Sequence, residues 1–253
     1  YPIEDRFILG EHGRCPFLNS KNLCDIYTEL GEDKLCETCT NFPRHITEFG
    51  NTREIGISLS CPVAVELIMK RKEPIRFTVS ENEEKVSEYN DIDAALYYSL
   101  CQARELAYTI CQDRTMKIRH RAVLLLDFAK KLQKKLKKNK LNKILDAYKD
   151  VQYRNERIEK LEKKYASYKK TMVVLRKWLD IYDRLEHIKT EWQGILSELS
   201  GYVDRKMPDV KTGAVIVNER DYEYEHLMVY YVYRYFLRAV FDENVLEKIK
   251  LSC

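Results

Sequence analysis

The sequence has little glycine and proline, with 8 Gly and 6 Pro among 253 residues. No two glycines are separated by a single residue, so the glycine-rich turn of a Rossmann-type nucleotide site is absent from the sequence. Five prolines and five glycines precede residue 75, and only four such residues follow it. The first part is therefore expected to be rich in turns, and the rest to be regular.

Long hydrophobic runs are also lacking. The most apolar stretch, residues 227–241, contains Arg234 and Arg238 and is too short to span a bilayer, so we expect a buried helix there. The chain opens on Tyr1 without a basic segment followed by an apolar run, so we expect no signal peptide, no membrane span and a cytoplasmic location. The sequence predicts no oligomeric state.

Charge of one sign is not in large excess. The net charge of +4 demands no polyanionic partner. The stretch "KKLQKKLKKNKLNK" at 130–143 holds eight lysines and no acid, but it has no interleaved aromatic residues. We therefore interpret it as a solvated helix face and do not expect nucleic-acid binding.

Apolar residues recur every three or four positions after Asp91, which is typical of amphipathic helices. This pattern predicts a mainly α fold. Together with the cysteines described below, the sequence predicts that a metal-organised cysteine-rich region (1–75) packs on a helical bundle region (76–253). Residues 209–225 are the best candidate for a loop or a short extended piece. The predicted helices cover 62–72, two stripes between 95 and 132, and 142–166, 168–199, 222–240 and 243–250.

Five of eight cysteines lie in the first quarter, at Cys15, Cys24, Cys36, Cys39 and Cys61. A lysine-rich chain without an export signal favours a reducing compartment, where clustered thiols usually hold metal. The two-residue gap between Cys36 and Cys39 lets both thiolates reach one ion from a tight turn. Both zinc and an iron-sulfur cluster accept thiolates, and the long irregular spacings with a single such gap favour iron.

Other interpretations of these residues stay open. The cysteines could be small buried hydrophobic residues, which is the favoured interpretation for Cys101 and Cys111 on a helical apolar stripe. Cys61 directly precedes a predicted helix, which lowers a thiol pKa and suits a ligand or a nucleophile. A cysteine-nucleophile enzyme would need a paired histidine, and the sequence offers none nearby.

The stretches "CPFLNSKNLCDIYTELGEDKLCETCTNFPR" and "LSCPVAVELIM" resemble the flagellin lysine-N-methylase (FliB-like) family, as does the C-terminal "HLMVYYVYRYFLRAVF". The cysteine segment is also similar to proteins with iron- or zinc-chelating domains. By motif, Cys15, Cys24, Cys39 and Cys61 stand at family positions, and Cys36 matches less closely.

This resemblance implies a protein lysine N-methyltransferase that acts on flagellin, uses S-adenosylmethionine and carries a [4Fe-4S] cluster, with zinc as the alternative. The cluster would serve either as a structural clamp or in binding the cofactor. A non-enzymatic metal-cluster binding and protein-interaction module is the alternative function. No catalytic or cofactor-binding residue is predicted.

Methyl transfer needs a neutral lysine, and at a pKa of about 10.4 only about one lysine in a few thousand is neutral at pH 7. An apolar channel lined by aromatic rings would favour the neutral amine and still attract the cationic product. The sequence holds 18 tyrosines, although half-buried packing is the favoured interpretation of those on a helix. The C-terminal candidates are Tyr222, Tyr224, Tyr230, Tyr231, Tyr233 and Tyr235.

Overall fold

The computed structural model describes residues 8–83, 92–136, 141–165, 168–185, 191–206, 219–250 and 252. The chain divides into two compact units, each described separately below. Unit 1 contains Tyr1–Lys70 and Asn82–Asp91, and unit 2 contains Arg71–Glu81 and Ile92–Cys253. Helices make up most of the described chain, so the prediction of a mainly α fold is confirmed. The predicted boundary at residue 75 stays a prediction.

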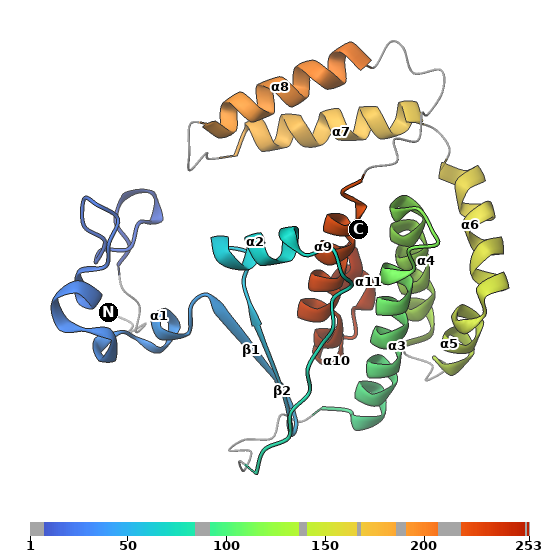
Figure 1. Cartoon of the computed structure of the whole chain (residues 1–253), viewed down its shortest axis with the longest axis horizontal. Coiled ribbons are helices and arrows are strands. Elements are labelled where there is room, and N and C mark those ends of the chain that lie inside the picture. The colour runs from blue at the N-terminus through green and yellow to red at the C-terminus, as the bar shows by residue number, and fades with distance from the viewer. Residues whose placement is uncertain are drawn as a thin grey trace. The chain divides into compact units, whose positions relative to one another are not determined.

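Unit 1 contains short helical turns followed by a β-hairpin and a helix (Figure 1). The helix α1 spans Glu37–Asn41, the strands β1 and β2 span Arg44–Phe49 and Thr52–Ile57, and α2 spans Pro62–Lys70. The strands pair antiparallel, with Phe49 opposite Thr52. Gly50 opens the two-residue loop at φ +59°, as hairpin turns of this length require.

The hairpin was not predicted from the sequence. Its signal was present, because "RHITEF" and "TREIGI" flank a Gly-Asn pair. Opposite His45 on β1 lies Gly56 on β2. A Cβ atom at Gly56 would lie 2.3 Å from the His45 Nε2 atom, so only glycine leaves room for the imidazole ring.

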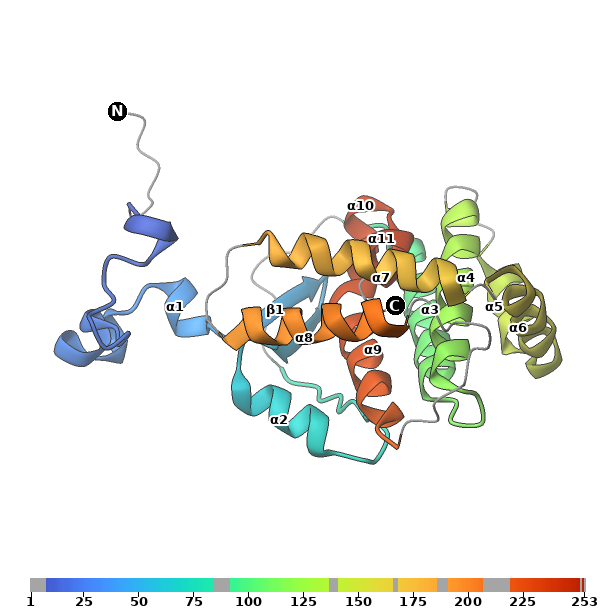
Figure 2. The same ribbon diagram turned by 90° about the horizontal axis from the view of Figure 1, so that it is seen from above.

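Unit 2 is helical in its described part (Figure 2). Its bundle contains α3 (Ala94–Gln112), α4 (Ile118–Leu136), α9 (Asp221–Tyr235) and α11 (Val245–Lys250), which contact one another. The short helices α5 (Asn142–Lys149) and α6 (Val151–Tyr165) pack beside α3 and α4. The turn η4 (Phe236–Arg238) and α10 (Ala239–Asp242) continue α9 toward α11.

The core of unit 2 comes from the apolar stripes of these helices. Leu100, Leu106 and Ile110 of α3 are buried, as are Leu124, Phe128 and Leu132 of α4. Met228, Val229, Val232 and Phe236 are buried as well, so the stretch 227–241 forms the expected buried helix over most of its length. No helix in the described ranges has the length and apolar character that crossing a membrane requires.

Two predicted long helices are each divided in the structure. The helix predicted over 142–166 ends at Lys149 and restarts at Val151, where the Asp150 carboxylate accepts a hydrogen bond of 2.8 Å from the Gln152 backbone N–H. The helix predicted over 168–199 is instead the pair α7 (Tyr168–Asp183) and α8 (Glu191–Lys206), which lie side by side (Figures 1 and 2). Within the predicted loop 209–225, residues 209–218 lie outside the described part and α9 begins at Asp221.

Candidate functional site

The Cys36–Cys39 pair lies at the start of α1, where Cys36 caps the helix and Cys39 belongs to it. The Cys39 backbone N–H and thiol both hydrogen-bond to the Cys36 sulfur, which lowers the pKa of the Cys36 thiol. The same thiol contact raises the pKa of Cys39, and burial and the nearby Cys36, Cys15 and Cys24 sulfurs raise it further. The sulfurs of Cys15, Cys24 and Cys36 therefore all act on the pKa of Cys39.

The loop that carries Cys15 and Cys24 is organised by polar contacts. The Arg14 guanidinium donates hydrogen bonds to the Asn22 side chain at 2.7 Å and to the Asn19 carbonyl at 2.6 Å. The Asn19 side-chain oxygen accepts from the backbone N–H groups of Lys21 and Leu23, which closes the turn between the two cysteines. Leu18 and Cys24 are bridged across this turn.

Cys61 lies directly before α2, as predicted, and its carbonyl accepts a hydrogen bond of 3.1 Å from the Val65 backbone N–H. No cysteine in the described ranges takes part in a disulfide, and Cys61 is partly exposed. No group of three or more His, Cys, Asp or Glu side chains within those ranges is arranged to hold a metal ion. The five-cysteine ligand set therefore stays a prediction.

Unit 1 has almost no hydrophobic core of its own. Within residues 8–70, Phe49 is the one buried side chain, whereas Tyr27, Leu30 and Phe42 are more than half exposed. A segment with so little buried apolar surface cannot offset the conformational entropy lost on folding without another source of free energy. The thiolate donor set fits zinc or an iron-sulfur cluster chemically, and binding such a group would supply that free energy.

Cys101 and Cys111 belong to α3 in unit 2, and Cys111 is fully buried. Its carbonyl accepts a hydrogen bond of 3.0 Å from Arg121. The interpretation of Cys111 as a packing residue is confirmed.

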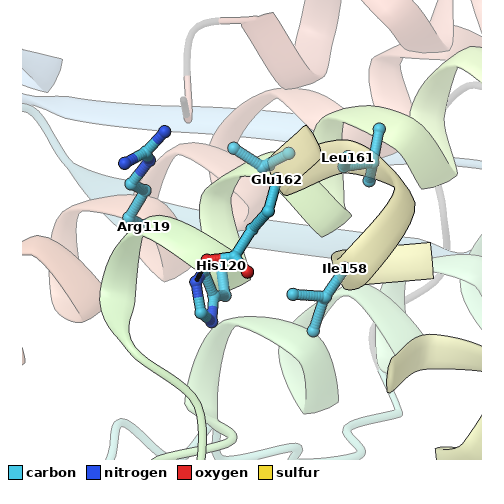
Figure 3. A pocket seen from close by; sticks show the side chains of 6 residues that line it. Arg119, His120, Ile158, Leu161 and Glu162 are labelled. Carbon is cyan, nitrogen blue, oxygen red and sulfur yellow. Dashed lines mark hydrogen bonds and ion pairs between the residues drawn. The ribbon is translucent and has the colours of Figure 1, made fainter. Parts of the chain in front are cut away.

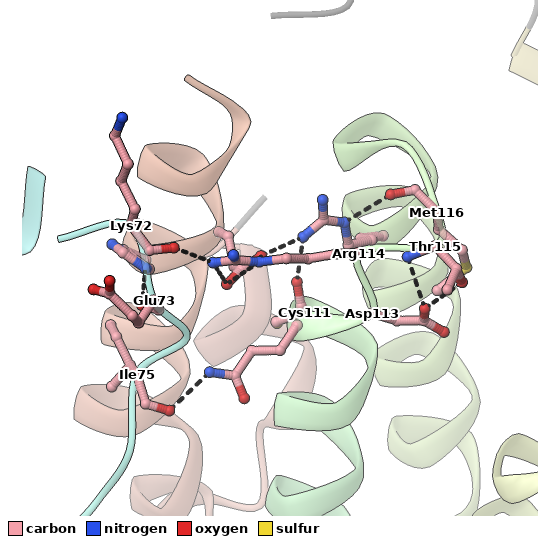
Figure 4. Close-up of polar contacts among 12 residues, drawn as sticks. Lys72, Glu73, Ile75, Cys111, Asp113, Arg114, Thr115 and Met116 are labelled. Atoms are coloured by element: carbon pink, nitrogen blue, oxygen red, sulfur yellow. Dashed lines mark hydrogen bonds and ion pairs between the residues drawn. The ribbon is translucent and has the colours of Figure 1, made fainter. Parts of the chain in front are cut away.

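A buried ionic cluster joins α9 to α4 and to the turn before α4 (Figure 4). The Glu225 carboxylate is fully buried and accepts hydrogen bonds from Arg121 at 2.6 Å and from Arg114 at 2.9 Å. The hydrogen bond with Glu225 raises the pKa of Arg114. Because this carboxylate is the counter-charge of two guanidinium groups, we interpret Glu225 as a structural anchor.

The same region holds the segment 72–75 against the bundle (Figure 4). Arg114 donates to the Lys72 carbonyl and Gln112 donates to the Ile75 carbonyl, each at 2.8 Å. The His226 ring nitrogen lies 3.0 Å from the Glu73 carbonyl oxygen. Sequence reasoning missed this cluster because Glu225 lies 104 residues from Arg121 and 111 residues from Arg114 along the chain, and no local pattern links them.

Most of the C-terminal tyrosines pack in the bundle, as predicted. Arg234 donates hydrogen bonds to the hydroxyls of Tyr235 at 2.9 Å and Tyr230 at 3.2 Å. Burial raises the pKa of Tyr231, whose ring stacks on Tyr235. The Tyr233 ring stacks on Phe77 with centroids 4.8 Å apart, whereas Tyr224 is more than half exposed.

A small hollow lies between α4 and α6 (Figure 3). His120 and Glu162 face each other there with 2.5 Å between the Nε2 and Oε1 atoms. The cavity volume is about 10 Å³, enough for a single water molecule and far below the volume of a cofactor site. Its other lining residues are Arg119, Val123, Ile158 and Leu161.

Within the lysine-rich stretch, residues 130–136 form the end of α4, with Leu132 and Leu136 buried and Lys134 and Lys135 in its last turn, and residues 137–140 lie outside the described part. Lys131 contacts the Tyr153 hydroxyl and lies 3.7 Å from Asp127. This part of α4 packs its apolar side in the core and has its polar side at the surface, which fits the predicted solvated helix face.

Comparison with known proteins relates the chain to lysine methylases. Lysine-N-methylases of Salmonella typhimurium strain LT2 and Salmonella choleraesuis strain SC-B67 are each 33% identical over 69 residues, which is 27% of this chain and 17% of the relative. The flagellar biosynthetic protein FliU of Salmonella muenchen is 35% identical over 57 residues, 22% of this chain and 34% of the relative. The matches thus span at most about a third of each relative's length, and no solved structure matches. The model of the FliB lysine N-methylase C-terminal domain matches residues 104–253, more than half of the chain, and on that match the chain belongs to the FliB lysine N-methylase family.

Proposed function

We propose that the protein is an S-adenosylmethionine-dependent lysine N-methyltransferase that acts on flagellin and carries a cysteine-bound [4Fe-4S] cluster. The observation that carries the methyltransferase proposal is the family match over residues 104–253, together with relatives named Lysine-N-methylase. The name of the FliU relative, a flagellar biosynthetic protein, supports flagellin as the substrate.

The reaction is a direct displacement at the methyl carbon. The neutral ε-amine of the substrate lysine attacks that carbon, the carbon–sulfur bond breaks, and the sulfur leaves with the electron pair as S-adenosylhomocysteine. One proton leaves the ammonium nitrogen for each methyl group added. The enzyme must therefore hold the lysine where its neutral form is favoured, either by desolvation or by a nearby base.

Cys15, Cys24, Cys36, Cys39 and Cys61 are the five residues that could hold the cluster. They lie within residues 8–70, where Phe49 is the one buried side chain, and this supports a structural clamp over direct participation in methyl transfer. When bound, the cluster would supply folding free energy and fix the loops that precede the hairpin. The lowered pKa of Cys36 favours the thiolate that a metal needs.

The activity is tested with full-length protein purified anaerobically and loaded with its cluster. Incubation with unlabelled S-adenosylmethionine and flagellin, followed by mass analysis of flagellin lysines, should show the mass of one methylene added for each methyl group transferred. A loaded sample that binds flagellin and transfers no methyl group would refute the enzyme proposal and favour a non-enzymatic interaction module.

The metal proposal has its own measurement. Iron, acid-labile sulfide and zinc analysis with a visible absorption spectrum should show iron and sulfide in equal amounts. Cys39→Ser should reduce the iron content strongly, whereas the matched variant Cys101→Ser, in unit 2, should leave it unchanged. A colourless protein with one bound zinc would overturn the iron-sulfur assignment and keep the thiolate site.

A further inference from the structure

The α7–α8 hairpin has an exposed apolar face in addition to its inner seam. The seam is closed by Met172, Leu179, Leu196 and Val203, which are all buried. A second set of large apolar side chains lies outside the seam, each between 41% and 51% exposed: Leu175, Trp178, Tyr182, Trp192, Ile195, Leu199 and Tyr202. Soluble proteins seldom expose contiguous apolar patches of this kind unless the patch binds something.

Both helices present these side chains on the same side of the hairpin. Positions 175, 178 and 182 form one stripe on α7, and positions 192, 195, 199 and 202 form one stripe on α8. Successive residues of a helix are rotated by roughly 100° about its axis, and on both helices this rotation places the stripe to the same rotational side of the seam residues. Because the two helices are antiparallel and their seams face each other, the two stripes point to the same side of the hairpin. On the opposite side Arg176 forms ion pairs with Asp180 at 3.1 Å and Asp204 at 2.6 Å.

We propose that this face, the 175–202 apolar face, binds the same face of a second copy of the chain. Two such hairpins placed face to face around a two-fold axis form a four-helix bundle, in which each apolar stripe packs between two others. This proposal concerns self-association and does not depend on the proposed methyltransferase activity.

Charged residues at the borders of the face favour one relative orientation of the two copies. Lys177 neighbours Val174 and Ile181 at the outer border on α7, and Glu198 neighbours Ile195 and Tyr202 at the outer border on α8. Because the seam residues pair antiparallel, Lys177 lies at the level of Glu198 along the hairpin. Placing α7 against α8 of the second copy therefore brings Lys177 near the opposite Glu198, whereas placing α7 against α7 would bring like charges together.

The size of the face indicates a reversible dimer. A 16-residue helix is about 24 Å long, and two helices side by side are about 20 Å wide, which gives a footprint of about 500 Å² per copy. Stable interfaces bury about 800 Å² per partner, so this one falls toward the transient class. We expect a dissociation constant on the order of 1–100 μM.

The test is sedimentation of the full chain over a concentration series from about 0.5 to 300 μM, combined with tryptophan fluorescence. The sequence has two tryptophans, Trp178 and Trp192, and both lie on the face. We expect a monomer at low concentration, a dimer at high concentration, and a blue shift of the emission that follows dimer formation. Val174→Glu, which puts a carboxylate at the border of the face one helical turn from Trp178, should weaken the dimer at least about tenfold, whereas the neighbouring Val173→Glu, on the polar side, should not.

A charge exchange tests the arrangement of the two copies. Lys177→Glu and Glu198→Lys should each weaken the dimer, and the double variant should restore it because the opposite charges then face each other again. A chain that stays monomeric over the whole series would overturn the proposal. Such a monomer with blue-shifted emission would show that the face is covered within one chain, and a monomer whose emission shifts only with flagellin would assign it to that protein. A dimer that Val174→Glu leaves intact would place the interface elsewhere and also overturn it.

Discussion

Glu225 provides the negative charge that balances two guanidinium groups in the interior of unit 2. It is fully buried between Arg121 and Arg114, and Arg121 is itself almost completely buried. We predict that Glu225→Ala lowers the free energy of unfolding by about 3–5 kcal/mol, because it leaves a buried guanidinium without its counter-charge. Urea unfolding followed by circular dichroism measures the loss.

The matched control is Lys250→Ala, which removes an exposed ion pair with Glu247 in the same unit. Exposed pairs are screened by water, so the urea midpoint should stay where it is in the unsubstituted protein. Equal effects of the two variants would mean that the Glu225 cluster is solvated in solution and that its anchoring role is wrong.

At Gly56 the constraint is space, since the His45 ring occupies the place of a side chain. We predict that Gly56→Ala destabilises the β1–β2 hairpin by about 1–3 kcal/mol, the usual cost of overpacking. Faster amide hydrogen exchange over residues 44–57 measures the change. Adding His45→Ala to Gly56→Ala should slow the exchange again, because the ring that overlaps the new methyl group is then removed. Exchange that stays equally fast would show that Gly56→Ala acts through the backbone and not through overlap with the ring.

Three helices meet at Asp127, whose carboxylate binds Arg157 of α6 at 2.8 and 2.9 Å and accepts a hydrogen bond from Tyr148 of α5. Burial alone would raise the pKa of Asp127, but the hydrogen bonds from Arg157 and Tyr148 and the charges of Lys131 and Arg157 lower it overall. A carboxyl pKa that is lower in the folded state contributes stability that is complete above the unfolded pKa of about 3.9 and is lost as the pH falls below it.

We therefore predict that Asp127→Asn lowers the urea midpoint at pH 7 and that its difference from the unsubstituted protein shrinks as the pH falls below about 4. Urea titrations at pH 7, 4, 3 and 2.5 measure the trend. A difference that grows toward acid pH would contradict the assigned direction of the pKa shift.

At the element scale, the hydrophobic periodicity predicted the positions of the helices more accurately than their ends. The apolar spacing is nearly continuous across Asp150, so the break is seen only in the structure, where the Asp150 backbone is extended and its carboxylate accepts a hydrogen bond from the Gln152 backbone N–H. The β-hairpin was not predicted although the sequence has a Gly-Asn pair with alternating flanks, because glycine and asparagine are also frequent in irregular loops. The ion pairs of Glu225 could not be predicted, since nothing local links residue 225 to residues 114 and 121.

At the scale of the whole molecule, the two units differ in what holds them together. The bundle of unit 2 buries long apolar stripes on α3, α4 and α9, whereas unit 1 buries Phe49 alone within residues 8–70. The sequence predicted this contrast from the distribution of cysteine, proline and glycine. It could not rank the five cysteines, and the structure does not rank them either, because no group of them within the described residues is arranged to hold a metal ion.

This contrast predicts what removal of the metal does. A chelator should unfold unit 1 and leave unit 2 folded, because metal binding supplies free energy to the first unit and hydrophobic burial stabilises the second. After chelation, limited proteolysis should cut within residues 8–70 at least about tenfold faster and leave the 92–136 helices intact, while the helical circular dichroism falls only slightly. Cys39→Ser should reproduce the pattern without a chelator, and Cys101→Ser should not. If the chelated protein loses both units together, the units are thermodynamically coupled; if it loses neither, unit 1 is held by contacts other than metal, and the clamp is wrong.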